Sequence, residues 1–562
     1  MIPNRLRTTI EKLPESVVFA GISLTVAIYS FIFLYPREWS RGLLINDEMW
    51  YAHLARNLYL GKGFVTNTLF PLQGGAGASF PTPAPFKQVG YPLASAWAWM
   101  ITGQSHRAML VIAIIAFALA AGMVYLVARR TGWGRPASLL VTGLVAFNPS
   151  IVSIEASATP EGLYLVFFLL AIWLVLRPTP LSVLLAGICH VVLILIKGHG
   201  IIYVPLFVAF LLIAPRRKRL ILTGTYIGAL VVTMLVASLI LPAHSVQMFE
   251  AGGNYALSFL IGTERSGANE VPYKEVNPPD AWEYILTHPA DYATKYLRMV
   301  SRTKFTLDGL GEPALSGVLF PALLLSLLLF LVDFVLPGRL FPRGNEEGLS
   351  ADSSGDGGTA GAAGAADALQ PDDRLVYLFY SVGIVGSFVF FWAIHLTVRF
   401  ISHTFPLMLL LIFYMAWKMR PFLPSIKKEL RTALWVAAVL YTIVYPAAST
   451  LWIAQHDPFA FIGRNLAVRS ADYQEISETV RDHVPPDAVL ITDMSHEINW
   501  LNEINTITFP LSEEDLRFLV EAYDVPALYE HPNKNRDWPW IPTVFRLVDD
   551  KNGRFWVRRD LP

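Results

Sequence analysis

Long apolar runs separated by short polar segments dominate this chain. We expect eleven membrane-spanning helices, at about 16–35, 108–128, 136–148, 161–176, 180–196, 200–214, 220–241, 315–336, 374–395, 401–417 and 432–454. A helix needs roughly 20 apolar residues to cross the hydrocarbon of a bilayer, and the third to sixth runs are shorter than this. Short helices of this kind usually tilt or surround a cavity cut into the membrane. The pattern therefore predicts a polytopic α-helical membrane protein.

The composition agrees with a membrane protein. Of the 562 residues, 54% are hydrophobic and only 16% are charged, whereas a soluble domain has roughly 25% charged residues. The formal net charge of zero gives no bulk electrostatic support for nucleic-acid binding. The single cysteine, Cys189, excludes a disulfide within the chain. Arg5, Arg7 and Lys12 precede the first apolar run, and no clear cleavage site follows it, so we expect a retained span.

Basic residues at alternate ends of the predicted spans indicate the orientation. The clusters are Arg5 to Lys12, Arg129 to Arg135, Arg177, Arg216 to Arg219, Arg339 to Arg343 and Lys418 to Lys428. The positive-inside rule then places the N-terminus in the cytoplasm. The opposite face receives the loops 36–107 and 242–314 and the segment 455–562. The cytoplasmic loop 344–372 is rich in Gly, Ala, Ser and Asp and is expected to be a disordered linker.

We expect two domains, a membrane domain over 1–454 and a small extracytoplasmic α/β domain over 455–562. In the second, helices are expected at 471–483 and 512–523, and strands at 488–492, 506–509 and 555–557. This segment has no metal-spacing motif, no Gly-rich phosphate loop and no nucleophile elbow. Its sequence alone assigns it no chemistry.

Two adjacent carboxylates, Asp47 and Glu48, lie about a dozen residues after the first apolar run. Trp50, Leu54 and Leu58 follow at helical spacing, which predicts an amphipathic helix over 48–60 that lies at the membrane interface. Asp47 at its start can cap the free N–H groups. Two interpretations stay open: Asp47 is only a cap and Glu48 only a solvated charge, or the pair performs acid–base chemistry.

Further charged candidates lie at the same outer rim. They are the acid Glu161, the cations Lys87, Lys197, His199 and Arg399, and His395 beside Arg399. In Lys197-Gly198-His199-Gly200, two glycines predict a tight outer turn that exposes the lysine and the histidine. Each candidate has a structural alternative: an acid at a helix start, a lysine that extends to the interface, or an ion pair within the chain.

Acids and cations at one rim suit transfer of a group from a phosphate-linked lipid. A carboxylate would deprotonate an acceptor hydroxyl, and the cations would neutralise the departing phosphate. A lipid-linked sugar flippase or small-solute transporter is the alternative. A transporter more often buries its charges mid-span and often has two matching halves, and no such internal repeat occurs here. A non-catalytic assembly subunit is a further alternative.

The first outer loop resembles that of the GT-C integral-membrane glycosyltransferases, nearest to the protein O-mannosyltransferases and the lipid A aminoarabinose transferase. The resemblance is carried by Asp47-Glu48, Tyr51, Ala55 to Leu58, Gly61 to Phe64, Lys87 to Pro92, Asn148-Pro149, Glu161, Lys197 to Pro205, Arg399 and Pro406. The pattern Trp500 with Thr508 to Pro510 is similar to the extracytoplasmic domain of many prokaryotic members. The protein O-mannosyltransferases carry a different module there.

The resemblance implies a polyprenyl-phosphate monosaccharide donor and inverting transfer to a glycan, lipid or protein acceptor. The reaction would take place at the outer face of a prokaryotic plasma membrane. Asp47 aligns with the essential acid of the family and would be the base, assisted by Glu48. Glu161 falls where both groups usually have an aspartate and would shape the acceptor site.

The remaining roles also follow from the resemblance. Lys197 and Arg399 align with positions that hold the donor phosphate, and Lys87 and His199 are expected to join them. The possible substrate contacts are Tyr51, His53, Arg56 and His395. The first loop lacks the Asp-x-Asp pattern of the oligosaccharyltransferases. No cofactor is therefore expected, although Glu48 and His53 leave a divalent metal open.

Overall fold

The structure is a computed structural model. It describes residues 13–69 except 41, 79–241 except 85–86 and 214–217, 285–336 except 312–316, 373–419 except 394, 395 and 397, isolated positions between 436 and 451, and 470–560 except 511, 532–537 and 552. The expected linker 344–372 and most of the expected span 432–454 lie outside these residues.

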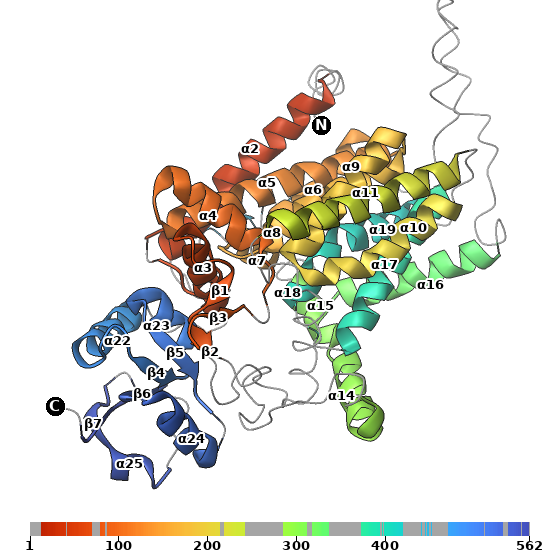
Figure 1. The fold of residues 1–562 in the computed structure, drawn as a ribbon. Helices are drawn as coiled ribbons and strands as arrows, with labels where there is room; N and C mark the ends of the chain where they lie inside the picture. Colours follow the sequence, from red (N-terminus) through yellow and green to blue (C-terminus); the bar gives the residue numbers. More distant parts are fainter. Residues whose placement is uncertain are drawn as a thin grey trace, which may run out of the picture.

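Apolar helices form the larger part of the molecule (Figure 1). They are α2 (Glu15–Leu34, continued by the π-helical turn Tyr35–Trp39), α5 (His106–Arg130), α6 (Arg135–Ala146), α7 (Pro149–Glu155), α8 (Glu161–Leu176), α9 (Pro180–Ile196), the 3-10 helix Gly198–Tyr203 with α10 (Val204–Ile213), α11 (Arg219–Ile240), α16 (Leu319–Val335), α17 (Asp373–Ala393), and α18 (Val398–Ile401) joined through the 3-10 turn Ser402–Thr404 to α19 (Phe405–Lys418). Helices thus occupy ten of the predicted spans. Five described helices are long and apolar enough to cross a membrane, or six if α6 and α7, bent by 67°, form one span. The total of eleven stays a prediction.

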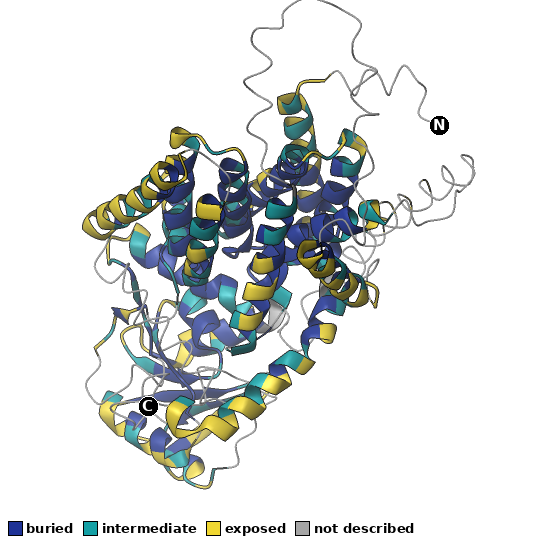
Figure 2. Cartoon of the chain, turned by 90° about the vertical axis from the view of Figure 1, so that its right-hand side faces the viewer, coloured by how far each residue is buried: buried dark blue, intermediate teal, exposed yellow. Residues whose placement is uncertain are grey.

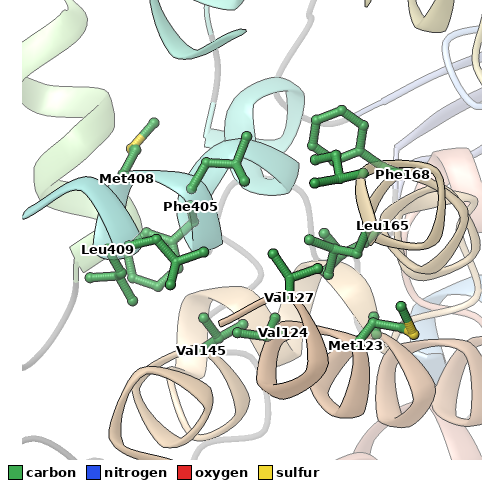
Figure 3. Packing of buried hydrophobic residues seen from close by; sticks show 14 of the residues in the cluster. Met123, Val124, Val127, Val145, Leu165, Phe168, Phe405, Met408 and Leu409 are labelled. Atoms are coloured by element: carbon green, nitrogen blue, oxygen red, sulfur yellow. The ribbon is translucent and has the colours of Figure 1, made fainter. Parts of the chain in front are cut away.

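The core of the bundle is apolar and closely packed. Side chains from α5, α6, α8 and α19 meet in it (Figure 3), among them Val124, Leu165 and Phe405, each 0% exposed. Buried residues fill the middle of the bundle, and exposed ones follow its outer helices (Figure 2). Many exposed residues on the outer helices are large and apolar, including Leu239 at 83% and Leu220 at 73%. An exposed apolar face of this extent fits contact with lipid.

The described residues between α2 and α5 form helices and short strands. These are α3 (Asn46–Tyr59), the short strands β1 (Val65–Thr66), β2 (Thr68–Leu69) and β3 (Thr82–Pro83), and α4 (Gly90–Thr102). A helix at the expected position is confirmed as α3, but the polar face expected to be exposed is wrong, because Glu48, His53, Arg56 and Asn57 are all buried. In the expected loop 242–314, the described residues form α14 (Pro289–Ser301) and α15 (Thr303–Gly311).

The C-terminal segment forms a mixed sheet with helices. The helices are α22 (Ser470–His483), α23 (Ser495–Asn502), α24 (Glu513–Tyr523) and α25 (Ile541–Val544), and the strands are β4 (Val489–Thr492), β5 (Asn505–Thr508), β6 (Ala527–Glu530), β7 (Phe545–Asp549) and β8 (Arg554–Arg558). The predicted helices occur as α22 and α24, and the predicted strands as β4, β5 and β8. The order β2-β5-β4-β6-β8-β7 adds a strand from the first outer loop, because Thr68 pairs in parallel with Thr506. The predicted domain boundary at residue 455 does not account for this pairing, because β2 lies in the membrane domain of that prediction.

Candidate active site

Five of the predicted charged residues form one continuous chain of ion pairs. Lys87 Nζ lies 2.7 Å from Asp47 Oδ1, and Lys197 Nζ lies 2.9 Å from Glu161 Oε1. Arg399 joins the two pairs, since Nη1 contacts Asp47 Oδ2 and Nε contacts Glu161 Oε1. The order is therefore Lys87, Asp47, Arg399, Glu161, Lys197. Three cations and two anions leave one net positive charge in this chain.

Two close backbone contacts bring these residues together. A Cβ on Gly162 would lie 2.2 Å from the carbonyl oxygen of Glu155, so the start of α8, and Glu161 with it, abuts the end of α7. A Cβ on Gly90 would lie 2.8 Å from the carbonyl oxygen of Leu195. The start of α4 therefore touches the end of α9, which brings the loop that carries Lys87 toward Lys197. Only glycine allows such approaches.

Aromatic rings hold the Lys87 ammonium in place. Its Nζ lies 4.3 Å from the ring centroid of Trp50 and 4.9 Å from that of Tyr51. Both rings belong to α3, as does Asp47. Such cation–π contacts favour a partly desolvated ammonium. Tyr51, expected as a substrate contact, is 3% exposed and packs in this position against Tyr91.

The middle of the ion-pair chain is its most exposed part. The side chain of Glu161 is 1% exposed, whereas those of Asp47 and Arg399 are 29% and 25% exposed. Burial by itself raises the pKa of the Asp47 carboxyl, but the charges of Lys87 and Arg399 outweigh it and hold that pKa well below its usual range. Asp47 is therefore ionised at neutral pH and partly exposed beside Arg399.

Glu48 has a structural position that differs from the expected one. It is 0% exposed, and its Oε2 accepts from the backbone N–H groups of Leu44 and Ile45 at 2.9 and 3.1 Å. Its Oε1 accepts from the N–H of Ala158 at 3.2 Å. Glu48 thus fixes the start of α3 against the segment before α8. This position favours a role in placing Asp47 over the expected role as second catalytic acid. The cap interpretation of Asp47 is wrong, because its oxygens bind Lys87 and Arg399.

His53 and Arg56 face the C-terminal sheet. Arg56 donates to the carbonyl oxygens of Trp500 at 3.0 Å and Asn499 at 2.9 Å. His53 Nδ1 contacts the Asn499 side chain, and its Nε2 lies 3.0 Å from the Thr66 hydroxyl. The two residues are 4% exposed or less. In this structure they attach α23 to α3, and their contact with substrate stays a prediction.

We expect that Arg56→Met loosens the C-terminal sheet. Hydrogen bonds from a charged donor contribute about 1.5–3 kcal/mol, and the carbonyls of Asn499 and Trp500 would lose theirs. Hydrogen exchange of α23 should become faster. Arg517→Met is the matched control, since Arg517 is 51% exposed on α24 and such surface changes stay within about 0.5 kcal/mol. Equal exchange in the two variants would contradict the assignment.

His199 packs among aromatic rings. Its ring packs 4.8 Å from Tyr164, 5.2 Å from Phe391 and 5.5 Å from His403, measured between centroids. No described contact joins it to the chain, so the expected place beside the donor phosphate is not supported. The predicted exposure of Lys197 is wrong as well, because that residue is 8% exposed. His395 lies outside the described residues.

The short helix α23 was missed from the sequence, although it borders the site. His496 stacks on Trp50 with ring centroids 4.2 Å apart, and Asn499 binds Arg56. Polar residues directly after a buried strand, as in Ser495-His496-Glu497, are the signal that could have indicated it. Among the described residues, no group of three or more His, Cys, Asp or Glu is placed to hold a metal ion.

Comparison with known proteins identifies the fold. Residues 90–241 match the sequence model of a family described as dolichyl-phosphate-mannose-protein mannosyltransferase. The archaeal oligosaccharyltransferase AglB of Archaeoglobus fulgidus, solved with an inhibitory peptide and a dolichol-phosphate, is similar at 13% identity and a TM-score of 0.53, over 96% of this chain and 75% of that chain. ArnT from Cupriavidus metallidurans in the apo state is similar at 14% identity and a TM-score of 0.53, over 96% of this chain and 97% of that chain. The same ArnT bound to undecaprenyl phosphate gives 13% identity and a TM-score of 0.52, over 96% and 97%. None of the curated proteins matches.

These similarities confirm the GT-C fold that the sequence predicts, and with it an integral membrane protein. Identities this low show the fold alone. The donor, the acceptor and the roles of single residues remain to be argued from the site.

Proposed function

We propose that the protein transfers a monosaccharide, hexose or pentose, from a polyprenyl-phosphate donor to an acceptor outside the cytoplasm, with inversion at the anomeric carbon. The observation that carries the proposal is the ion-pair chain Lys87, Asp47, Arg399, Glu161, Lys197. A carboxylate between two cations supplies both a base and a phosphate site within a few ångströms. A similar fold in proteins solved with dolichol-phosphate and undecaprenyl phosphate supports the donor class.

The donor phosphate would bind to the ion-pair chain at its exposed middle, beside Asp47 and Arg399. Its negative charge competes with Asp47 for Lys87 and Arg399, and the net charge of plus one favours its entry. As these cations turn to the phosphate, the pKa of Asp47 returns toward its ordinary value, and the carboxylate becomes a stronger base. Donor binding would thus activate Asp47 only when a leaving group is in place.

In the transfer step, the acceptor hydroxyl gives its proton to Asp47 while its oxygen bonds to the anomeric carbon. The bond from that carbon to the phosphate oxygen breaks, and the electron pair stays on the phosphate. The phosphate gains one negative charge, which Arg399, Lys197 and Lys87 neutralise. Attack from the face opposite the leaving group inverts the configuration. Glu161, held by Arg399 and Lys197, keeps both cations in position.

The purified full-length protein in detergent should consume donor without any ion gradient. The probes are undecaprenyl-phosphate mannose and undecaprenyl-phosphate arabinose, with a membrane extract of the host as the source of acceptor. Mass spectrometry should detect undecaprenyl phosphate and a glycosylated product. If both donors stay intact in detergent while liposomes carrying the protein move them between leaflets, the flippase interpretation replaces this proposal. The orientation is tested separately by protease access to α22–α24, which should be cleaved only from outside.

A further inference from the structure

The first turn of α23 lies against the start of α3, beside Asp47. The ring of His496 stacks on Trp50, and the Lys87 ammonium lies 4.3 Å from the centroid of the same indole. Helix α23 of the C-terminal domain therefore packs beside the ion-pair chain. Its chemistry there is not used by the transfer step described above.

Glu497 is the carboxyl group that α23 contributes next to the ion-pair chain. It is 6% exposed, and its carboxylate accepts hydrogen bonds from the Asn46 side chain and from the backbone N–H groups of His496 and Glu497. Its Oε2 has no hydrogen-bond partner among the residues that the structure describes. A buried carboxylate oxygen without a partner costs free energy. Its presence next to the site calls for a functional explanation.

The surroundings of Glu497 shift the pKa of its carboxyl in the direction opposite to that of Asp47. Burial raises the pKa of Glu497 to about 7, and the nearby charge of Asp47 acts in the same direction. The other titratable group from its own helix is His496, which also senses Lys87 and His53. On the remaining sides, α22 and β5 meet α23 through the uncharged Ser477 and Thr506.

Two carboxyls whose environments move their pKa values apart can divide the work of an acid–base site. Asp47 is paired with two cations, Lys87 and Arg399, and holds a proton poorly. Glu497 lies at the same end of α3 without a cationic partner in a described contact. A group that titrates near neutral pH is the better destination for a proton.

Resting on the transfer function proposed above, we propose that Glu497 is the final proton acceptor of the reaction. The acceptor O–H bond breaks, and its proton passes through Asp47 to the Glu497 carboxylate, which becomes neutral. The acceptor oxygen bonds to the anomeric carbon, and the leaving phosphate keeps the electron pair of the broken bond. After the products leave, Glu497 releases the proton to the outer water. The C-terminal sheet is thus a part of the catalytic site as well as a cover.

The test compares pH profiles of the full-length protein between pH 5.5 and 8.5 with the donor that the wild type consumes. The wild-type rate should rise with pH, with a midpoint near 7, because only ionised Glu497 accepts a proton. Glu497→Gln should lower kcat by about 10²-fold or more and abolish the rise. The KM for donor should stay within about twofold, since the phosphate site is intact. Glu497→Asp keeps the carboxylate and should retain the rise.

Glu521→Gln is the matched control, because Glu521 is exposed on helix α24 of the same C-terminal segment. It should reproduce the wild-type kcat and profile. If Glu497→Gln keeps the rise and the wild-type kcat, the inference is overturned while the transfer function stands. If the wild type transfers no sugar, the transfer function itself fails. Should the Gln variant not fold, a flat wild-type profile, or an Asp variant without the rise, overturns the inference equally.

Discussion

Asp47→Asn should lower sugar transfer by about 10²–10⁴-fold, the usual loss when a catalytic base is removed. The amide keeps the size of the side chain and can still accept a hydrogen bond from Lys87 or Arg399, so the fold should persist. It cannot take up the acceptor proton at neutral pH. The measurement is the initial rate of product formation from the donor that the wild type consumes.

The same variant should bind undecaprenyl phosphate at least as tightly as the wild type. Removing the Asp47 charge raises the net charge of the ion-pair chain, and the anion no longer competes with a carboxylate for Arg399. Asp291→Asn is the control, because Asp291 is exposed on α14, and it should leave rate and binding unchanged. A near-normal rate for Asp47→Asn would remove Asp47 from the role of base. A lost rate with lost binding would indicate a structural role instead.

The helices were predictable because the apolar runs are long and continuous. Burial of such runs depends on composition and length more than on partners. The strands β2, β6 and β7 were not predicted. β6 is four residues long and buried on both faces, so it shows no alternation of polar and apolar residues. β2 has two residues, and its pairing with β5 depends on a contact between segments more than 430 residues apart.

The charged residues of the site could be predicted from the sequence. The different roles of the adjacent residues Asp47 and Glu48 could not. Charges are rare in this chain, so those at the rim are conspicuous. Adjacent helical residues, however, point about 100° apart. Which of Asp47 and Glu48 is exposed depends on where Ala158 lies. The polar face of α3 suggested substrate contacts for His53 and Arg56, and only the position of α23 shows that this face is covered.

Arg399→Gln should have the second large effect. Arg399 is the only described link between the Lys87–Asp47 pair and the Glu161–Lys197 pair. Without it, the net charge of the site falls from plus one to zero, and two carboxylates lose a partner. Truncating one member of a buried, hydrogen-bonded charge pair costs about 2–5 kcal/mol, which corresponds to roughly 30-fold to several-thousand-fold in affinity. The measurement is the Kd for undecaprenyl phosphate.

Arg399→Lys separates charge from geometry. The lysine restores the net charge, but a single ammonium cannot span Asp47 and Glu161 as the guanidinium does. We therefore expect binding between that of wild type and that of Arg399→Gln, with a transfer rate closer to the glutamine variant because Asp47 and Glu161 are no longer held in register. Arg298→Gln, at an exposed position on α14, should leave both quantities unchanged. If Arg399→Lys matches the wild type in both, charge alone accounts for Arg399. If Arg399→Gln still binds undecaprenyl phosphate normally, the phosphate site lies elsewhere.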